Sequence, residues 1–479
     1  MRLVLLATMT LHSLACVFQA APAWAQATAA GKEPNRPAYQ NRRFDEDWSG
    51  LRGTDRSTTD DFWDRLKFIP LTRDESVWLS LAGQLRERVE YFQHYLFGAS
   101  KPKDTDAYLL SRVRLSADLH VTPYLRLFVE EKSAFALDRD LAGGRTSTYV
   151  EEFALQNGFA DLVLPLGEQA SVTLRGGRQE LIFGSQRLVG EPDFGQTRRT
   201  YDGGQGIVGI GDWTISSFWT QSVVPEKYQF NDSTSDRRLF GVYATWPAHL
   251  LPVNLDLYWL GVDNALATFN GTAGRERRHT LGGRIWGKIG QTGLDFEVEG
   301  AAQLGTVGRE DIAASMLTAV LGYALPLRRL SARVYLNVDY ASGDDKPGGR
   351  VGTFNPLYTA AHTFLGYIDY IGRQNIISPS VGVAMTPVRD LTLTLQQYAF
   401  WRASDRDALY NKSGAVFRPG TTTTTCYVGA ELDLLATYNI TRHLLTTAGY
   451  SHFFPGTFIQ KTGPSKDSDF FYWSLQYTF

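Results

Sequence analysis

Long runs of the chain alternate apolar and polar residues with a period of two. In LAGQLRERVEY, which starts at Leu81, Leu85 and Val89 lie on one side of an extended chain, and Arg86 and Arg88 lie on the other. A later run, LLSRVRLSADLHV, repeats this pattern. Because successive side chains of a strand point to opposite faces, the period predicts strands and argues against helices.

The alternation recurs to the end of the chain. Many of the runs have ten or more residues, and a tilted strand needs about 9 to 11 residues to cross a bilayer. A β-sandwich, the soluble alternative, has no need of such uniformly long strands. We predict eighteen strands, at residues 79–92, 107–121, 125–136, 153–164, 170–181, 200–211, 213–223, 238–246, 253–261, 278–288, 294–304, 312–324, 332–341, 376–386, 391–402, 427–438, 444–454 and 469–479.

The connections between these strands fall into two classes. Every second connection is a short turn, such as TPY, GD or PVRD. The connections between them are mostly long and polar. This pattern predicts an all-β fold, a transmembrane antiparallel β-barrel of about 18 strands with short periplasmic turns and long extracellular loops. We expect the long loops at residues 182–199, 224–237, 262–277, 342–375 and 403–423.

The beginning of the chain has the features of a secretory signal. Arg2 precedes a short apolar stretch and the small residues of APAWAQA. We therefore predict a signal peptide at residues 1–25, a periplasmic N-terminal segment at 26–75 and an outer-membrane barrel at 76–479. After cleavage the chain keeps one cysteine, Cys426, which has no partner for an internal disulfide.

The last strand, DFFYWSLQYTF, has one aromatic face. Phe471, Trp473, Leu475 and Tyr477 share that face, and we expect it to contact outer-membrane lipid and lipopolysaccharide. Strands that end in phenylalanine, here Phe479, resemble the signal recognised by the bacterial outer-membrane assembly machinery. We expect that machinery to be a partner.

Composition excludes several function classes. The formal net charge is −2, which gives no general affinity for nucleic acid. No metal-ligand spacing or phosphate-binding glycine loop occurs, so we expect no metal and no cofactor. Lipid hydrolysis is the enzymatic alternative, and the strand histidines nearest to serines are His120 and His452. No nucleophile-elbow spacing surrounds them, so we expect that the protein is not an enzyme.

The polar faces of the predicted strands carry an uneven distribution of charge. The first three strands combine six bases with three acids, whereas later strands place mainly acids on the polar face. A basic wall attracts anions into a narrow pore, although the same charges could pair across neighbouring strands. The bases are Arg86, Arg88, Arg112, Arg114, Arg126 and Lys132, the nearby acids are Glu90, Asp118 and Glu130, and the later acids are Asp295, Glu297, Glu299, Glu431 and Asp433.

A glycine pair interrupts the run RGGRQELIFGSQRLVGEPDFGQTRRTYDGG. We hypothesise a β-bulge at Gly176 and Gly177 that turns Arg175, Arg178 and Glu180 toward the lumen. Three further arginines, Arg187, Arg198 and Arg199, follow in a loop that either folds inward or meets lipopolysaccharide phosphates at the rim.

Motifs along the whole mature chain resemble the alginate-export family of outer-membrane proteins. They include LKFIPL, GQLRERVEYF, GRQELIFGSQRLVG, RRTYDGG, SGDDKPGGRVGTFNPLY and GYIDYIGRQN. The resemblance implies an 18-stranded barrel that passes a polyuronate through an arginine-lined constriction. Phe194 stands where the family pattern has tryptophan, and the periplasmic turns lack a long gating turn. Matching positions are Arg86, Arg88, Arg112, Arg114, Glu130, Arg178, Arg187, Arg199 and Asp202.

We therefore predict a passive channel of the bacterial outer membrane for anionic polysaccharide or related anionic organic substrates. The alternative is a general porin or one for hydrophobic or aromatic compounds. We expect residues 26–75 either to dock a periplasmic secretion partner or to form an entry to the lumen. The predicted pore-lining residues are the nine matching positions together with Arg126 and Glu180.

Overall fold

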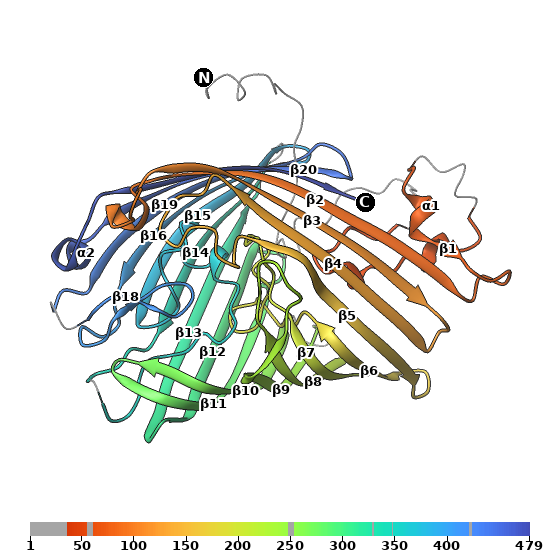
Figure 1. Ribbon diagram of the computed structural model, residues 1–479, viewed down its shortest axis with the longest axis horizontal. Coiled ribbons are helices and arrows are strands. Elements are labelled where there is room, and N and C mark those ends of the chain that lie inside the picture. Colours follow the sequence, from red (N-terminus) through yellow and green to blue (C-terminus); the bar gives the residue numbers. More distant parts are fainter. Residues whose placement is uncertain (1–35, 55–60, 248–252, 328–329, 347, 421–423) are drawn as a thin grey trace.

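The structure is a computed structural model that describes residues 36–54, 61–247, 253–327, 330–346, 348–420 and 424–479. Its main feature is a closed, antiparallel, 18-stranded β-barrel (Figure 1). The predicted signal peptide lies outside the described residues. No described helix is long and apolar enough to cross a membrane.

The eighteen barrel strands correspond one to one with the predicted runs. They are β2 (Trp78–Gln93), β3 (Asp106–His120), β4 (Leu125–Leu137), β5 (Glu151–Pro165), β6 (Ala170–Gln179), β7 (Tyr201–Ile210), β8 (Trp213–Val223), β9 (Ser233–Trp246), β10 (Asn254–Phe269), β11 (Thr272–Lys288), β12 (Leu294–Val307), β13 (Glu310–Leu325), β14 (Ser331–Ala341), β15 (Ile376–Val388), β16 (Leu391–Trp401), β19 (Tyr427–Asn439), β20 (Leu444–Pro455) and β21 (Ser468–Thr478). Short elements outside the barrel wall are β1 (Ile69–Pro70), β17 (Leu409–Tyr410), β18 (Val416–Arg418), α1 (Asp64–Lys67), α2 (Thr457–Thr462) and the 3-10 turns η1 (Arg43–Asp45), η2 (Ser49–Leu51), η3 (Tyr95–Gly98) and η4 (Ala361–Thr363).

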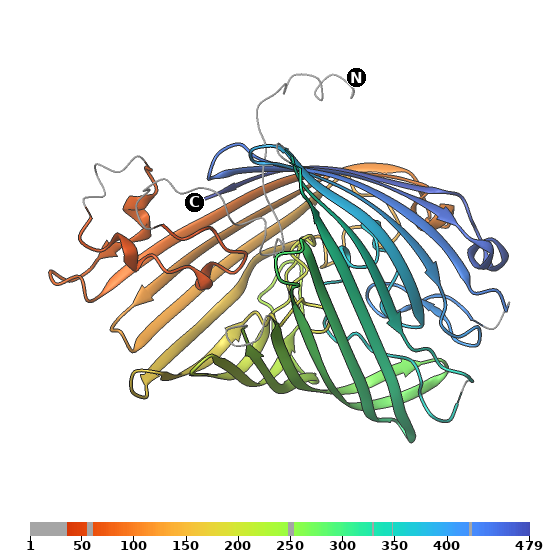
Figure 2. The same ribbon diagram turned by 180° about the vertical axis from the view of Figure 1, so that it is seen from behind.

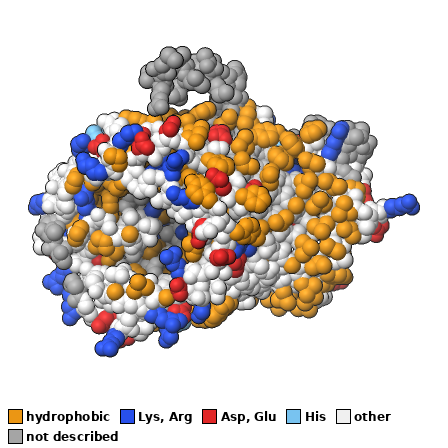
Figure 3. Space-filling model, viewed as in Figure 1, with side chains coloured by type: hydrophobic (Ala, Val, Ile, Leu, Met, Phe, Trp, Pro, Cys, Tyr) orange, Lys and Arg blue, Asp and Glu red, His pale blue; other side chains and the backbone are white. Residues whose placement is uncertain are grey.

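The barrel closes where the last strand, β21, pairs with the first, β2. Trp473 lies opposite Val89, and Phe479 exchanges two backbone hydrogen bonds of 2.9 Å with Gly83. Phe471 and Trp473 point outward and are 41% and 44% exposed, as expected for side chains that face lipid. Closure gives every strand a partner on both edges, which a sheet needs in hydrocarbon. Figure 3 shows the resulting apolar outer wall.

The two rims differ as predicted, with one exception. Short turns join the strands at one end, which we call the turn rim, and most long connections lie at the other, the loop rim. The predicted loop at 262–277 is wrong, because β10 and β11 continue to a two-residue turn at Asn270 and Gly271. Beyond the apolar band, backbone pairing continues although the hydrophobic alternation has ended, so the sequence pattern does not show these strand ends.

Long loops fold into the barrel and fill much of its interior (Figures 1 and 2). The loop between β6 and β7 contributes Leu188 and Val189 to the buried core, and the loop between β14 and β15 contributes Phe354, Ile368 and Ile371. These loops meet in the lumen, where Val189 pairs with Tyr358. The interior is therefore packed with chain and is not an open tube.

The described part of the N-terminal segment packs at the turn rim, next to β2. Trp48, Leu51 and Phe68 form a small buried cluster with Trp78 of β2. The Lys67 ammonium donates a 2.8 Å hydrogen bond to the Leu81 carbonyl. These contacts fix residues 36–54 and 61–77 against the barrel, in place of a free tail.

Candidate functional site: a loop held across the lumen

The loop of residues 180–200, which we call the constriction loop, is held by arginines of β2 and β3. Arg86 donates hydrogen bonds to the carbonyls of Asp193 (2.7 Å) and Gly195 (2.9 Å). Arg112 donates to the same Asp193 carbonyl at 3.0 Å and to its carboxylate at 2.9 Å. All three charged side chains are buried. The alternation of β2 and β3 points these guanidinium groups inward, so the basic wall anchors the loop.

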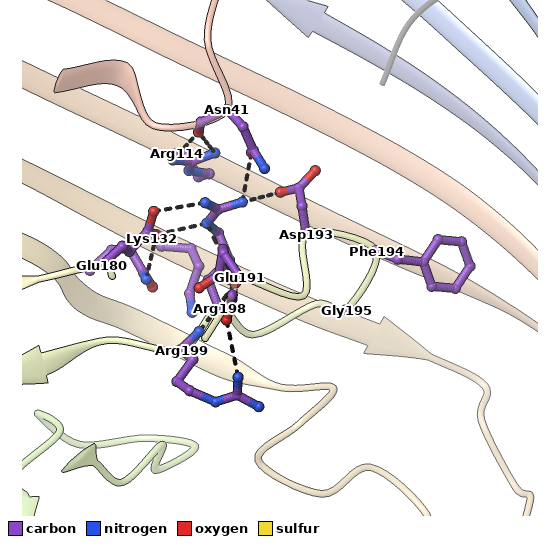
Figure 4. Close-up of polar contacts among 12 residues, drawn as sticks. Asn41, Arg114, Lys132, Glu180, Glu191, Asp193, Phe194, Gly195, Arg198 and Arg199 are labelled. Carbon is purple, nitrogen blue, oxygen red and sulfur yellow. Dashed lines mark hydrogen bonds and ion pairs between the residues drawn. The ribbon is translucent and has the colours of Figure 1, made fainter. Parts of the chain in front are cut away.

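Arg198 is the centre of this loop's polar network (Figure 4). Its guanidinium forms a two-pronged ion pair with Glu180, at 2.8 and 2.7 Å, and also contacts Asp193. The two carboxylates in turn raise the pKa of Arg198 well above its usual value, although burial opposes them. Burial raises the pKa of the neighbouring Glu191 to about 8, so this carboxyl group is mostly neutral at pH 7.

The charges around the loop leave two arginines without a matching carboxylate. Four ion pairs match one arginine with one carboxylate each: Arg88 with Glu90, Arg112 with Asp193, Arg114 with Glu130 and Arg198 with Glu180. Arg86 donates only to neutral oxygens, and the nearest Asp193 carboxylate oxygen is 3.9 Å away. Arg199 of the loop likewise donates only to the carbonyls of Gly190 and Tyr358. With Glu191 neutral, six guanidinium groups face four carboxylates, which leaves two positive charges.

The opposite wall is acidic and is also covered by loops. Arg187 of the constriction loop crosses to β12, where it pairs with Glu297 and lies 3.2 Å from Glu299. On β19, Glu431 accepts the backbone N–H of Ile368 at 2.9 Å, and other acids of this wall accept from neighbouring loop donors. One loop thus bridges the lumen, with an anion on the basic wall and a cation on the acidic wall.

A cavity of about 70 Å³ remains between the constriction loop and the strands β19 to β2. Arg86, Arg88 and Tyr472 line it together with Phe194 and His362. The Phe194 ring lies between the His362 ring, 3.6 Å away, and the Arg88 guanidinium, 3.9 Å away. The cavity holds only a few water molecules, so a sugar ring enters it only if a loop moves.

Nine of the eleven sequence-predicted residues lie in three places on the luminal side. Arg86, Arg88, Arg112, Arg114, Glu130 and Glu180 surround the constriction loop on the basic side. Arg126 lies nearer the turn rim and pairs with Asp118 at 2.6 Å. Arg187 reaches the acidic wall, and Arg199 donates to the carbonyls of Gly190 and Tyr358. Some of these charges pair across neighbouring strands, which was the alternative to a role in the pore, as Arg114 does with Glu130. Others, such as Arg112, hold the constriction loop.

The predicted bulge at Gly176 and Gly177 is wrong. Pairing with β5 and β7 runs through both glycines without a register shift. Arg175 therefore faces the lumen, whereas Arg178 and its partner Asp202, 2.7 Å away, lie on the opposite face of the sheet. A Cβ at Gly177 would lie 2.3 Å from the Gly158 carbonyl, so this glycine permits a close approach of strands.

Three contributors to the site were not among the predicted pore-lining residues. Asp193 and Arg198 lie in the constriction loop, and Asn41 reaches it from the N-terminal segment, where its side-chain oxygen accepts a 2.8 Å hydrogen bond from Arg198. The apolar LIF and LVG stretches of the loop are a signal that it is not solvated. No sequence signal singles out Asn41. Among the residues that the structure describes, no group of three or more His, Cys, Asp or Glu side chains could hold a metal ion.

The fold is similar to that of outer-membrane channels from Pseudomonas aeruginosa. OccK11 (OpdR) has a TM-score of 0.52 and 13% identity, covering 83% of this chain and 96% of that one. OpdK, crystallised with vanillate, has a TM-score of 0.56 and 10% identity, and the match covers 83% of this chain and 98% of that one. OccK2 (OpdF), in complex with glucuronate, has a TM-score of 0.54 and 12% identity, and the match covers 83% of this chain and 98% of that one. No curated protein matches the sequence.

Sequence and fold agree on a family. The model of the alginate export family matches residues 77–472, which span the whole barrel wall apart from the end of the last strand. This family and this fold are those of outer-membrane channels. The chain therefore belongs to the alginate export family and is a bacterial outer-membrane β-barrel protein.

Proposed function

We propose that the protein is a channel for anionic saccharides of the uronate type, which move past the basic wall of the constriction. The observation that carries this proposal is the unbalanced Arg86, which lines the central cavity and donates only to neutral oxygens. A carboxylate of the substrate is the partner that it lacks. Guanidinium groups bind carboxylates through strong, paired hydrogen bonds.

Two structures of similar fold agree with this substrate class. OccK2 was crystallised with glucuronate and OpdK with vanillate, and both ligands carry a carboxylate. The small cavity adds a condition. A hexuronate residue is larger than 70 Å³, so we propose that the constriction loop shifts during passage.

The test is the ion selectivity of the purified protein in planar bilayers. We expect wild-type channels to prefer anions and the double variant Arg112→Ala with Arg114→Ala to lose most of that preference. Arg275→Ala with Arg277→Ala is a matched control, because it removes two exposed arginines outside the lumen. Equal reversal potentials for the wild type and the lumen variant would contradict the proposal.

Substrate block distinguishes the proposal from a general or hydrophobic-compound porin. Uronate oligomers should reduce the current at concentrations where neutral maltotriose has no effect. Block by small aromatic compounds without a carboxylate, and none by uronates, would favour the alternative.

A further inference from the structure

Part of the N-terminal segment, residues 36–51, lies in the turn-rim mouth of the barrel, and we call it the inlet segment. The Phe44 ring packs edge-on against Phe128 and Phe159, with ring centres 5.4 and 5.1 Å away. The Phe44 carbonyl accepts a 2.7 Å hydrogen bond from Arg126. Arg126 and both phenylalanines alternate with outward, exposed leucines and valine of the same strands, so these contacts are luminal.

The inlet segment extends from this mouth to the constriction loop through one residue, Asn41 (Figure 4). The Asn41 carbonyl oxygen accepts hydrogen bonds of 3.2 and 3.1 Å from the two terminal nitrogens of Arg114. Its side-chain oxygen accepts one of 2.8 Å from Arg198. Two buried guanidinium groups on different elements thus converge on two oxygens of one neutral residue.

A carboxylate could accept hydrogen bonds from the same two guanidinium groups. A carboxylate also presents two oxygens to convergent N–H donors, and hydrogen bonds between two charged partners are roughly twice as strong as bonds to a neutral oxygen. Arg114 and Arg198 also pair with Glu130 and Glu180, and their further hydrogen bonds to Asn41 go to neutral oxygens. Each of these bonds to Asn41 is therefore weaker than a bond of the same donor to an anionic oxygen.

We propose that Arg114 and Arg198 form a carboxylate-binding site that Asn41 occupies as a surrogate ligand, and that a uronate carboxylate in the lumen displaces Asn41 and loosens the inlet segment. The proposal rests on the proposed function, because it takes uronates as the substrate. It adds a specific site and makes the substrate itself the agent that clears the mouth of the channel.

Variants of Asn41 test the site. We expect a uronic acid trimer, trigalacturonate, to block Asn41→Ala channels at several-fold lower concentration than wild type, since the Arg198 bond to the surrogate is lost. Asn41→Asp places a carboxylate permanently on the same donors, and it should require several-fold higher concentration. Maltotriose is the neutral control. Unchanged blocking concentrations in both variants, with wild type blocked normally, would overturn the proposal and leave the proposed function intact.

A second measurement keeps Asn41 in place and follows the inlet segment directly. In a Cys426→Ser background, Phe44→Cys puts a thiol in the luminal aromatic cluster, and Asp47→Cys puts one at an exposed position of the same segment. The trimer should accelerate maleimide labelling at position 44 and leave position 47 unchanged. An unaltered rate at position 44 in channels that the trimer blocks would also overturn the displacement. If no channel, including Asn41→Ala, responds to the trimer, the proposed function itself fails.

Discussion

The basic wall of β2 to β4 and the acidic wall of β12 and β19 are both covered by loops, but in different ways. On the acidic wall, Glu297 pairs with Arg187, and Glu431 accepts the backbone N–H of Ile368, so both carboxylates bind donors of the loops. On the basic wall, much of the hydrogen bonding goes to neutral carbonyls, and one guanidinium has no carboxylate of its own. The acids of β12 are thus matched by arginines, while the basic wall keeps capacity for an anion.

The largest effect is expected from Arg187→Ala, which breaks the covering of the acidic wall. Removing one partner of a buried ion pair costs about 3–5 kcal/mol, because the remaining charge stays buried. Glu297 keeps Arg284 at 3.0 Å, so the loss should fall mainly on Glu299 and on the loop. Thermal unfolding in detergent should occur at lower temperature, and channels should shift toward cations.

The control for that change is Arg275→Ala. Arg275 pairs with Asp263 at 2.6 Å, but its side chain is exposed, and exposed ion pairs contribute little to stability. Unfolding temperatures that drop equally in both variants would show that the acidic wall does not depend on Arg187.

Gly366→Ala tests the backbone donors of the same wall. Gly366 has a φ of +88°, and a Cβ there would lie 2.5 Å from the Glu431 carboxylate. We expect a loss of about 1–3 kcal/mol from the positive φ, and more from the clash. Gly53→Ala has a φ of +68° with nothing within 4 Å, so it reports the φ effect alone. Equal unfolding temperatures for the two variants would argue against close packing of this loop on the wall.

Arg86→Gln tests the spare capacity of the basic wall with a smaller effect on stability. Glutamine keeps a donor for the loop carbonyls and removes the unmatched charge, and no carboxylate loses its nearest partner. We expect normal unfolding and a weaker anion preference in reversal-potential measurements. A loss of stability comparable with that of Arg187→Ala would show that Arg86 is mainly a structural anchor.

The smallest effect should come from pH. Burial raises the pKa of Glu191 to about 8, with Glu180 and Asp193 adding to this rise and Arg198 and Arg199 opposing it. Between pH 7 and 9 the group loses its proton and adds a negative charge that cancels one of the two excess positive charges. Anion preference should fall over this range in wild type and stay level in Glu191→Gln. If the anion preference of Glu191→Gln falls in the same way, a titrating group other than Glu191 causes the fall.

The strands could be predicted from sequence because each barrel residue faces either lipid or lumen, and that choice appears directly as alternation. Inward-facing Arg86, Arg112 and Arg114 were identified in this way. The constriction could not be derived fully, because its partners come from distant loops. Asn41 and Arg198 meet across more than a hundred residues, and no periodicity records such a contact.

The wrong predictions have a related cause. At Gly177 the missing side chain makes room for a neighbouring strand, whereas a glycine pair in sequence looks the same in a bulge. In the region 262–277, the pairing of β10 with β11 is irregular between Asn264 and Ala267, and β11 carries consecutive charged residues at 275–278, so neither strand end alternates regularly. Hydrophobic pattern therefore reports on the membrane layer and is uninformative above it.

The tight turn between β10 and β11 has a practical consequence. Asn270 and Gly271 both have positive φ, 40° and 87°, as in the turn that Asn-Gly favours in two-residue hairpins. The turn ends the paired ladder of two long strands, and Gly271 is exposed. A short epitope inserted at Gly271 would let an antibody added outside intact cells report surface delivery of channel variants.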